Sequence, residues 1–174
     1  MLHSLPLYSV DASALIEMKD IYPIHVFRSM WDFVGSTADS GRLVVAEPVG
    51  EECKDAVFKP WFASHPKIIL RFSEELNNYV NALQTEIQKA ALPLVNPSSQ
   101  KSQNDPFVVA AALMIEARNL ADLTTGSRRT CHVITYEKNR GPQAQYKSIR
   151  DVCDHYSIRC LNWPEMLQIE SWSC

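Results

Sequence analysis

Four acidic side chains occupy comparable places in the sequence, because each follows a strand-like apolar run or begins a strongly apolar helical one. They are Asp11, Glu52, Asp105 and Glu137. In a parallel α/β sheet, the carboxyl ends of the strands and the N-termini of the following helices meet at one edge, so we expect these acids to lie together. Grouped carboxylates repel one another unless a cation lies between them. Oxygen ligands without His or Cys favour Mg²⁺ or Mn²⁺ over zinc, and the pattern therefore predicts a site for one of these two ions.

Each acid also has a simpler interpretation when it is taken alone. Asp11 and Asp105 are suited to capping the helices that follow them. Glu52 and its neighbour Glu51 fit the solvated face of an amphipathic segment, and Glu137 stands in a polar loop. The metal hypothesis therefore depends on the joint placement of the four acids, and hence on the predicted topology.

Several other common catalytic patterns are missing from the sequence. The five glycines form neither a dinucleotide-binding pattern nor a P-loop, and there is no G-x-S-x-G segment. The five histidines lack metalloprotease spacing, and the five cysteines lack the paired Cys-x-x-Cys hooks of zinc ribbons. The net charge of −3 argues against a protein that holds nucleic acid by charge alone. It does not exclude a nuclease, because an acidic site attracts phosphate once cations fill it.

The elements that must position these residues alternate between strands and helices. Strands are predicted at residues 7–10, 42–46, 68–70, 132–136 and 158–161. Helices are predicted after Asp11, from Pro23 to Gly41, from Pro48 through Asp55, from Ser73 to near Pro93, over 107–117, around 149–156 and after Pro164. This alternation predicts an α/β fold, with a central, mainly parallel sheet between two layers of helices.

The 174 residues show no internal repeat, which predicts a single domain over residues 1–174. No apolar run approaches the roughly 20 residues that a membrane span needs. The apolar N-terminus lacks a basic region and is interrupted by Asp11, so we expect no signal peptide and a cytoplasmic location.

The segment Tyr8-Ser-Val-Asp-Ala-Ser resembles the opening strand and helix of PIN-domain nucleases, in which Ser or Thr follows the first aspartate by two residues. Three later segments resemble segments of that family and occur in the same order along the chain. Glu52 follows the second strand, Asp105 leads a helix of small residues, and Glu137 follows a late Val-Ile-Thr strand.

The chain is more similar to a prokaryotic branch that resembles VapC-type toxins than to PIN-domain nucleases in general. This likeness runs from Tyr8 to about Leu167. The matching positions are Tyr22, Pro23, Phe27, Trp31, Glu137, Lys138, Asp151, Val152, Cys153, Cys160 and Asn162. Glu137 stands where many members have Asp, which implies indirect or water-mediated ligation there. The adjacent Glu51 competes with Glu52, and the resemblance favours Glu52.

The resemblance implies a three-layer α/β/α PIN-like domain that acts as a metal-dependent endoribonuclease, the toxin of a toxin–antitoxin pair. The implied metal ligands and catalytic residues are Asp11, Glu52, Asp105 and Glu137, and the residues that orient them are Ser13 and Thr135. A metal-activated water would hydrolyse the RNA, leaving a 5′ phosphate and a 3′ hydroxyl. The implied partners are an RNA substrate, a cognate antitoxin protein and a second copy of the chain, for which helices with Trp31 and Trp61 offer apolar surface.

Basic residues after the fourth acid are candidates for binding the phosphates of RNA, although each is equally suited to a solvated surface. The main candidates are Lys138, Arg140 and Lys147, and the further ones are Lys54, Arg128, Arg129 and Arg150.

Two other functions are compatible with the sequence. One is a PIN-like binding module that has lost catalysis. The other is an unrelated α/β phosphatase-like enzyme that would form a phospho-aspartate at Asp11, although Ser13 interrupts the Asp-x-Asp pattern of such enzymes.

Overall fold

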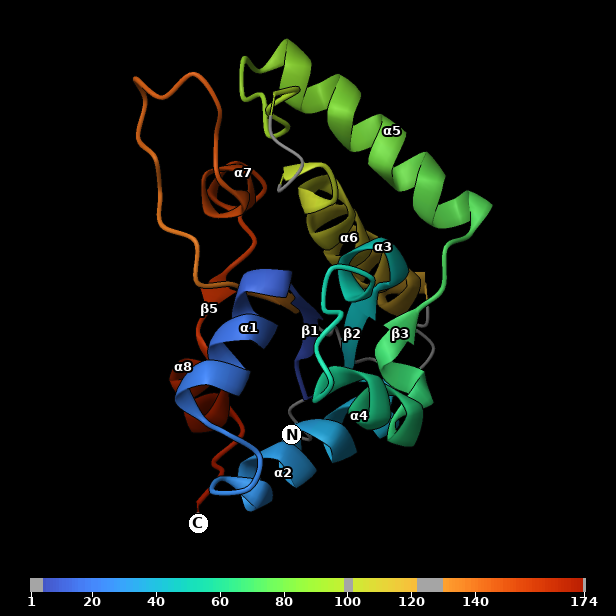
Figure 1. The fold of residues 1–174 in the computed structure, drawn as a ribbon. Coiled ribbons are helices and arrows are strands. Elements are labelled where there is room, and N and C mark those ends of the chain that lie inside the picture. Colours follow the sequence, from blue (N-terminus) through green and yellow to red (C-terminus); the bar gives the residue numbers. More distant parts are fainter. Residues whose placement is uncertain (1–4, 99–101, 122–129, 174) are drawn as a thin grey trace.

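Five short strands form one sheet at the centre of the part of the chain that the computed structural model describes, residues 5–98, 102–121 and 130–173 (Figure 1). The strands are β1 (Leu7–Val10), β2 (Leu43–Ala46), β3 (Ile69–Leu70), β4 (Cys131–Ile134) and β5 (Cys160–Leu161). Their order is β3-β2-β1-β4-β5, and every neighbouring pair is parallel. The α/β class and the parallel sheet predicted from the sequence are confirmed.

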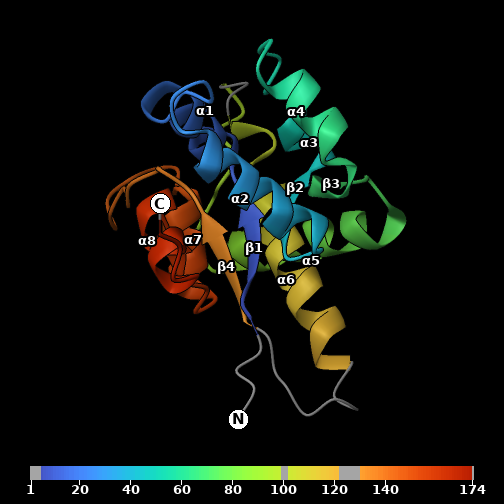
Figure 2. The same cartoon turned by 90° about the horizontal axis from the view of Figure 1, so that it is seen from below.

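The central strand β1 pairs on both sides, with Ser9 opposite Val44 of β2 and Val133 of β4. The chain first builds the sheet outwards from β1 through β2 to β3. It then returns and places β4 against the other side of β1, where the two strands run side by side in Figure 2. Ligands of α/β sheets bind at such a reversal of strand order, beyond the carboxyl ends of the strands. Asp11 lies at this point.

Helices cover both faces of the sheet. They are α1 (Ala12–Ile21), α2 (Arg28–Asp39), α3 (Glu47–Gly50), α4 (Phe58–Ser64), α5 (Glu74–Lys89), α6 (Asp105–Ala121), α7 (Ile149–His155) and α8 (Trp163–Ile169), with a 3₁₀ turn at Pro66–Ile68. Adjacent residues of β1 point to opposite faces. Accordingly, Ser9 Oγ donates to Val108 O of α6 (2.8 Å), whereas Tyr8 Oη donates to Glu170 Oε1 just after α8 (2.7 Å).

The helix α6 is buried between the sheet and α5, which lies outermost in Figure 1. Its run of small and apolar residues explains this position, because a helix that is apolar all round needs cover on every side. Val108, Ala111 and Met114 are fully buried. Since alanine side chains allow close approach, α6 holds its first residue, Asp105, near the carboxyl end of β1.

Most predicted elements are present, with shifted ends. The helix predicted from Ser73 is confirmed, and Ser73 Oγ accepts a hydrogen bond from Leu76 N (3.2 Å). The helix predicted from Pro48 through Asp55 is wrong in extent, because α3 ends at Gly50 and Glu52 lies in the following turn. The helix predicted from Pro23 begins at Arg28, after a separate turn.

Two tryptophans expected to offer surface for a second copy belong to the core instead. Trp31 and Trp61 are 0% and 6% exposed, and their rings meet edge to face at 5.1 Å. Neither ring is therefore available as apolar surface for a second copy, and the homodimer itself stays a prediction. In the portion of the chain that is described, no helix combines the length and apolarity required to cross a membrane.

Candidate metal centre

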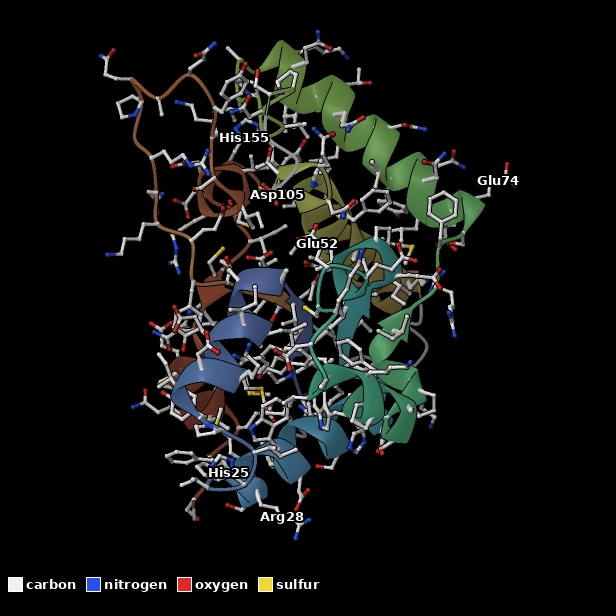
Figure 3. All side chains as sticks on the ribbon, in the orientation of Figure 1. His25, Arg28, Glu52, Glu74, Asp105 and His155 are labelled. Carbon is white, nitrogen blue, oxygen red and sulfur yellow. The ribbon has the colours of Figure 1, made fainter. Side chains whose placement is uncertain are left out.

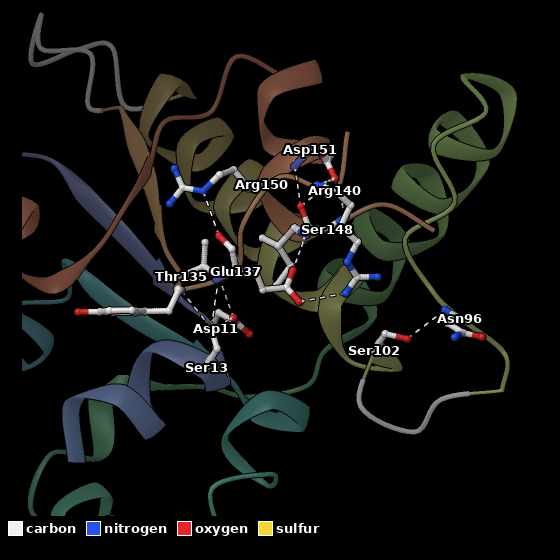
Figure 4. Close-up of polar contacts among 12 residues, drawn as sticks. Asp11, Ser13, Asn96, Ser102, Thr135, Glu137, Arg140, Ser148, Arg150 and Asp151 are labelled. Carbon is white, nitrogen blue, oxygen red and sulfur yellow. Dashed lines mark hydrogen bonds and ion pairs between the residues drawn. The ribbon is translucent and has the colours of Figure 1, made fainter. Parts of the chain in front are cut away.

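Asp11 directly follows β1, and its buried carboxylate accepts hydrogen bonds from two hydroxyl groups. It is 5% exposed, and its Oδ2 accepts hydrogen bonds from Ser13 Oγ and from Thr135 Oγ1, the latter at 2.9 Å (Figure 4). Both hydroxyls are themselves fixed, because Ser13 Oγ accepts from Tyr136 N and Thr135 Oγ1 accepts from Glu137 N, each at 3.1 Å. The Asp11 side chain does not cap α1. Ser13 and Thr135 therefore contact Asp11 as expected from the sequence, and they leave its Oδ1 without a side-chain donor.

Burial raises the pKa of Asp11. The hydroxyls of Ser13 and Thr135 act in the opposite direction, and the charge of Glu52 raises the pKa further. The backbone amide of Ala12 also lowers the pKa of Asp11, so three donors together partly offset the cost of its burial.

Asp105 is the first residue of α6 and is 8% exposed, yet no described residue donates a hydrogen bond to its carboxylate. The capping interpretation of Asp105 is therefore wrong. Burial raises its pKa, the charges of Glu137, Asp11 and Glu52 raise it further, and Arg140 partly offsets them, giving a pKa of about 8. A buried carboxylate without donors, surrounded by other acids, is costly unless a cation accompanies it.

Glu52 lies in the turn after α3, on the side of Asp105 (Figure 3). It is exposed, whereas Asp11 and Asp105 are buried. Asn104 fixes it by donating from Nδ2 to Glu52 Oε1 (2.7 Å) and to Pro48 O (3.0 Å). Partial burial raises the pKa of Glu52, and the Asn104 hydrogen bond lowers it. Because the charge of Glu52 raises the pKa of both Asp11 and Asp105, Glu52 rather than Glu51 is the member of the cluster.

The contribution of Asn104 to the site was not predicted from the sequence. Its position directly before Asp105 was the available clue. Two consecutive residues thereby supply the buried carboxylate of Asp105 and the amide of Asn104 that orients Glu52.

Glu137 is turned towards α7. Its Oε2 accepts from Ile149 N (2.8 Å), its Oε1 lies 3.6 Å from Arg140 Nη2, and Arg150 Nε donates to its backbone oxygen (3.1 Å). Burial raises the pKa of Glu137, the Ile149 amide opposes this, and the charge of Asp11 raises it again. Glu137 therefore adds negative charge to the cluster while its own oxygens contact Ile149 N and Arg140.

Among the described residues, no three His, Cys, Asp or Glu side chains lie close enough to enclose a metal ion. The four predicted acids nonetheless influence one another electrostatically. Like charges keep carboxylates apart when no cation joins them. The carboxylates of Asp11 and Asp105 would suit a hard cation that keeps several waters and takes few protein oxygens.

Lys147 does not join this cluster. It is 7% exposed, and its ammonium group donates to three carbonyl oxygens in the preceding loop, those of Gly141 (2.9 Å), Pro142 (3.0 Å) and Ala144 (3.1 Å). An ammonium group has three protons to donate. Lys147 therefore holds the loop that follows Glu137, and its predicted contact with RNA does not fit this arrangement.

The remaining basic candidates are divided between the rim of the site and undescribed segments. Lys138 is exposed, and Arg140 lies against Glu137. Arg128 and Arg129 lie outside the described residues.

The family model described as "Domain of unknown function (DUF4411)" matches residues 8–174. The chain belongs to the DUF4411 family. The match covers all four acids of the cluster together with Ser13 and Thr135. No curated protein and no solved structure matches this DUF4411 chain.

The chemistry of this DUF4411 chain must therefore be argued from its residues. Two oriented carboxylates, Asp11 and Glu52, face a third, Asp105, that has no hydrogen-bond donor among the described residues. Carboxylates of this kind would suit a hard cation that keeps most of its waters, and such a cation can in turn contact a phosphate group.

Proposed function

We propose that this DUF4411 chain is a PIN-like, metal-dependent endoribonuclease that binds Mg²⁺ or Mn²⁺ through Asp11, Glu52 and Asp105. The observation that carries the proposal is the state of Asp105, which is 8% exposed and has a pKa of about 8. Its three acidic neighbours and the lack of a donor among the described residues make it unfavourable as a bare carboxylate. A divalent cation removes that cost.

Each residue of the site has a separate task in this proposal. A bound divalent ion neutralises charge on the phosphate and lowers the pKa of a coordinated water. Ser13 and Thr135 hold Asp11 in one orientation through hydrogen bonds to its Oδ2. Asn104 likewise fixes the orientation of Glu52 by donating a hydrogen bond to its Oε1. Residues that orient metal ligands in this way affect metal affinity strongly.

The rim of the site carries positive charge that suits a polynucleotide. Lys138 is exposed there, and Arg140 lies 3.6 Å from Glu137. Glu137 supports the loop and the first amide of α7 and adds charge to the cluster. The choice of RNA as substrate rests on the resemblance to PIN-domain nucleases. The role as the toxin of a toxin–antitoxin pair, the cognate antitoxin and the second copy of the chain rest on the same resemblance. The proposed cytoplasmic location rests on the N-terminal sequence, which lacks the basic region of a signal peptide.

One observation favours the alternative of a binding module without catalysis. No three potential metal ligands converge in the described residues, and Glu137 is engaged with Ile149 N. In this alternative the chain binds its partner without cutting it.

The test is cleavage of a mixed RNA pool with Mn²⁺ or Mg²⁺ by the wild type, Asp11→Asn and Asp105→Asn. Asp32→Asn, on the exposed face of α2, is the matched control. We expect cutting that needs the metal, is abolished by both cluster substitutions and is unchanged in the control, with folding verified by circular dichroism. Cutting that survives both substitutions would refute the proposed site. A folded wild type that neither cuts RNA nor binds metal would favour the binding module.

A further inference from the structure

A hollow of about 560 Å³ opens beside Glu52 at the same edge of the sheet as the acidic cluster. Its lining comes from the segment after β2 and from α4, and consists of Gly50, Glu51, Cys53, Lys54, Lys59 and Phe62. The volume lies within the roughly 300–1,000 Å³ of small-ligand sites. The hollow adjoins the cluster directly, because Cys53 follows Glu52 in the chain and Lys54 N donates to Glu52 O (3.0 Å).

The hollow offers two positive charges for a ligand. Lys54 and Lys59 are exposed, and neither side chain forms an ion pair with another described residue. Lys19 on the nearby α1 differs, because its ammonium group lies 2.9 Å from Asp55 and 3.3 Å from Asp20. Free ammonium groups on flexible stems bind phosphate as point charges.

An aromatic ring forms one wall of the hollow. Phe62 is half-buried and stacks on Phe58, with ring centroids 5.7 Å apart and an interplanar angle of 24°. Its ring also contacts Trp61, at a centroid distance of 5.6 Å. These neighbours hold the Phe62 ring in place, and a fixed aromatic ring beside cationic groups is a typical platform for an unpaired base.

From these contacts, and resting on the proposed nuclease function, we infer that the hollow binds one unpaired nucleotide next to the scissile phosphate. Its base lies against Phe62, and its phosphate contacts Lys54 and Lys59. A base within a duplex cannot enter such a hollow without leaving its partner. The substrate class that follows is single-stranded RNA, or a single-stranded segment of a folded RNA.

The test measures binding separately from cleavage. A fluorescently labelled single-stranded RNA of about ten nucleotides is titrated with the full chain in EDTA over a range of salt concentrations. The pocket variant is Lys54→Gln/Lys59→Gln. The control variant is Lys67→Gln/Lys89→Gln, which removes the same charge from exposed lysines away from the hollow.

We expect the pocket variant to bind more weakly, with the slope of log K against log salt reduced by about 0.7, because the neutralisation of one phosphate of a single strand is lost. The control should keep the wild-type slope. Phe62→Leu should lose about fivefold or more in affinity for RNA, and should lose nothing for an abasic strand of the same length. A duplex of the same sequence should bind more weakly than the single strand.

Equal affinities and slopes for the two double variants would overturn the inference, as would equal binding of duplex and single strand. If metal-dependent cleavage is present in that case, only the inference about the hollow fails. If the pocket variant loses binding as expected but the wild type cuts no RNA with metal, the hollow stands and the nuclease proposal fails.

Discussion

Asp105→Asn should stabilise the chain in the absence of metal while it destroys the metal site. Asparagine keeps the shape of the side chain but cannot ionise, so it removes the cost of a buried charge. In the wild type, burial and three acidic neighbours raise the pKa of Asp105 from 3.8 to about 8. At about 1.4 kcal/mol for each pH unit between these values, the ceiling on this cost is roughly 5–6 kcal/mol above pH 8. Relaxation and water penetration reduce it, and we expect a gain of about 2–3 kcal/mol.

The pH dependence of the gain identifies its cause. Below about pH 4, Asp105 is protonated in both the folded and the unfolded chain, and the substitution should have little effect. Between about pH 4 and pH 8 the unfolded chain has lost a proton that the folded chain retains, so the stability of the wild type relative to the variant falls as pH rises. Above about pH 8 the difference is constant.

The assay is thermal unfolding of both proteins in EDTA at about pH 4 and about pH 9, with Asp32→Asn as control. For a chain of this size the expected gain raises Tm by about 4–12 °C at the higher pH. Adding Mn²⁺ at about 100 times its Kd should stabilise the wild type by about 2.7 kcal/mol and leave Asp105→Asn unchanged. A variant no more stable than the wild type at about pH 9, or a gain of equal size at both pH values, would refute the assigned environment of Asp105.

Three further substitutions test the residues around the acids. Ser13→Ala removes one of the two hydroxyls that orient Asp11, so Mn²⁺ affinity measured by calorimetry should fall about 10–100-fold, and wild-type affinity would contradict the orienting role. Asn104→Ala leaves Glu52 without its amide donor and should weaken Mn²⁺ binding by about tenfold or more with little loss of secondary structure, whereas unchanged binding would remove Glu52 from the site. Lys147→Met deprives three loop carbonyls of their donor and should lower the free energy of unfolding by about 1–3 kcal/mol in urea titrations. The RNA affinity of Lys147→Met should equal that of the wild type. A loss of RNA affinity without a loss of stability would instead support the prediction that Lys147 contacts RNA.

Much of the fold follows from local sequence patterns. Apolar runs of β-formers identified all five strands, because fully buried parallel strands need apolar residues on both faces. The helix α5 could be predicted with its start, since Ser73 is a good capping residue and the apolar positions recur at helical spacing. The apolar character of α6 likewise indicated its central position.

Other features depend on contacts between distant segments and could not be predicted locally. The end of α3 at Gly50 is one example, because the Glu-rich sequence after it is compatible with a longer helix. Trp31 and Trp61 are another, since their mutual packing depends on how α2 and α4 meet.

In the candidate site, too, some features could be predicted from the sequence and others depend on tertiary contacts. Asp11, Ser13 and Thr135 were predicted together, and all three meet because β1 and β4 are neighbours. Lys147 was predicted as an RNA contact from its charge alone, whereas its three carbonyl partners come from a loop whose path the sequence does not specify. The role of Asn104 depends on the approach of α3 to α6, which is a tertiary contact.

The most direct test of the central claim is anomalous X-ray diffraction from crystals of the full chain grown with Mn²⁺. We predict a manganese peak between Asp11 Oδ1, Glu52 and Asp105, with carboxylate oxygens about 2.1 Å from the ion and waters completing its coordination. A well-ordered site at these residues without any manganese peak, or a peak bound only by other residues, would contradict the account.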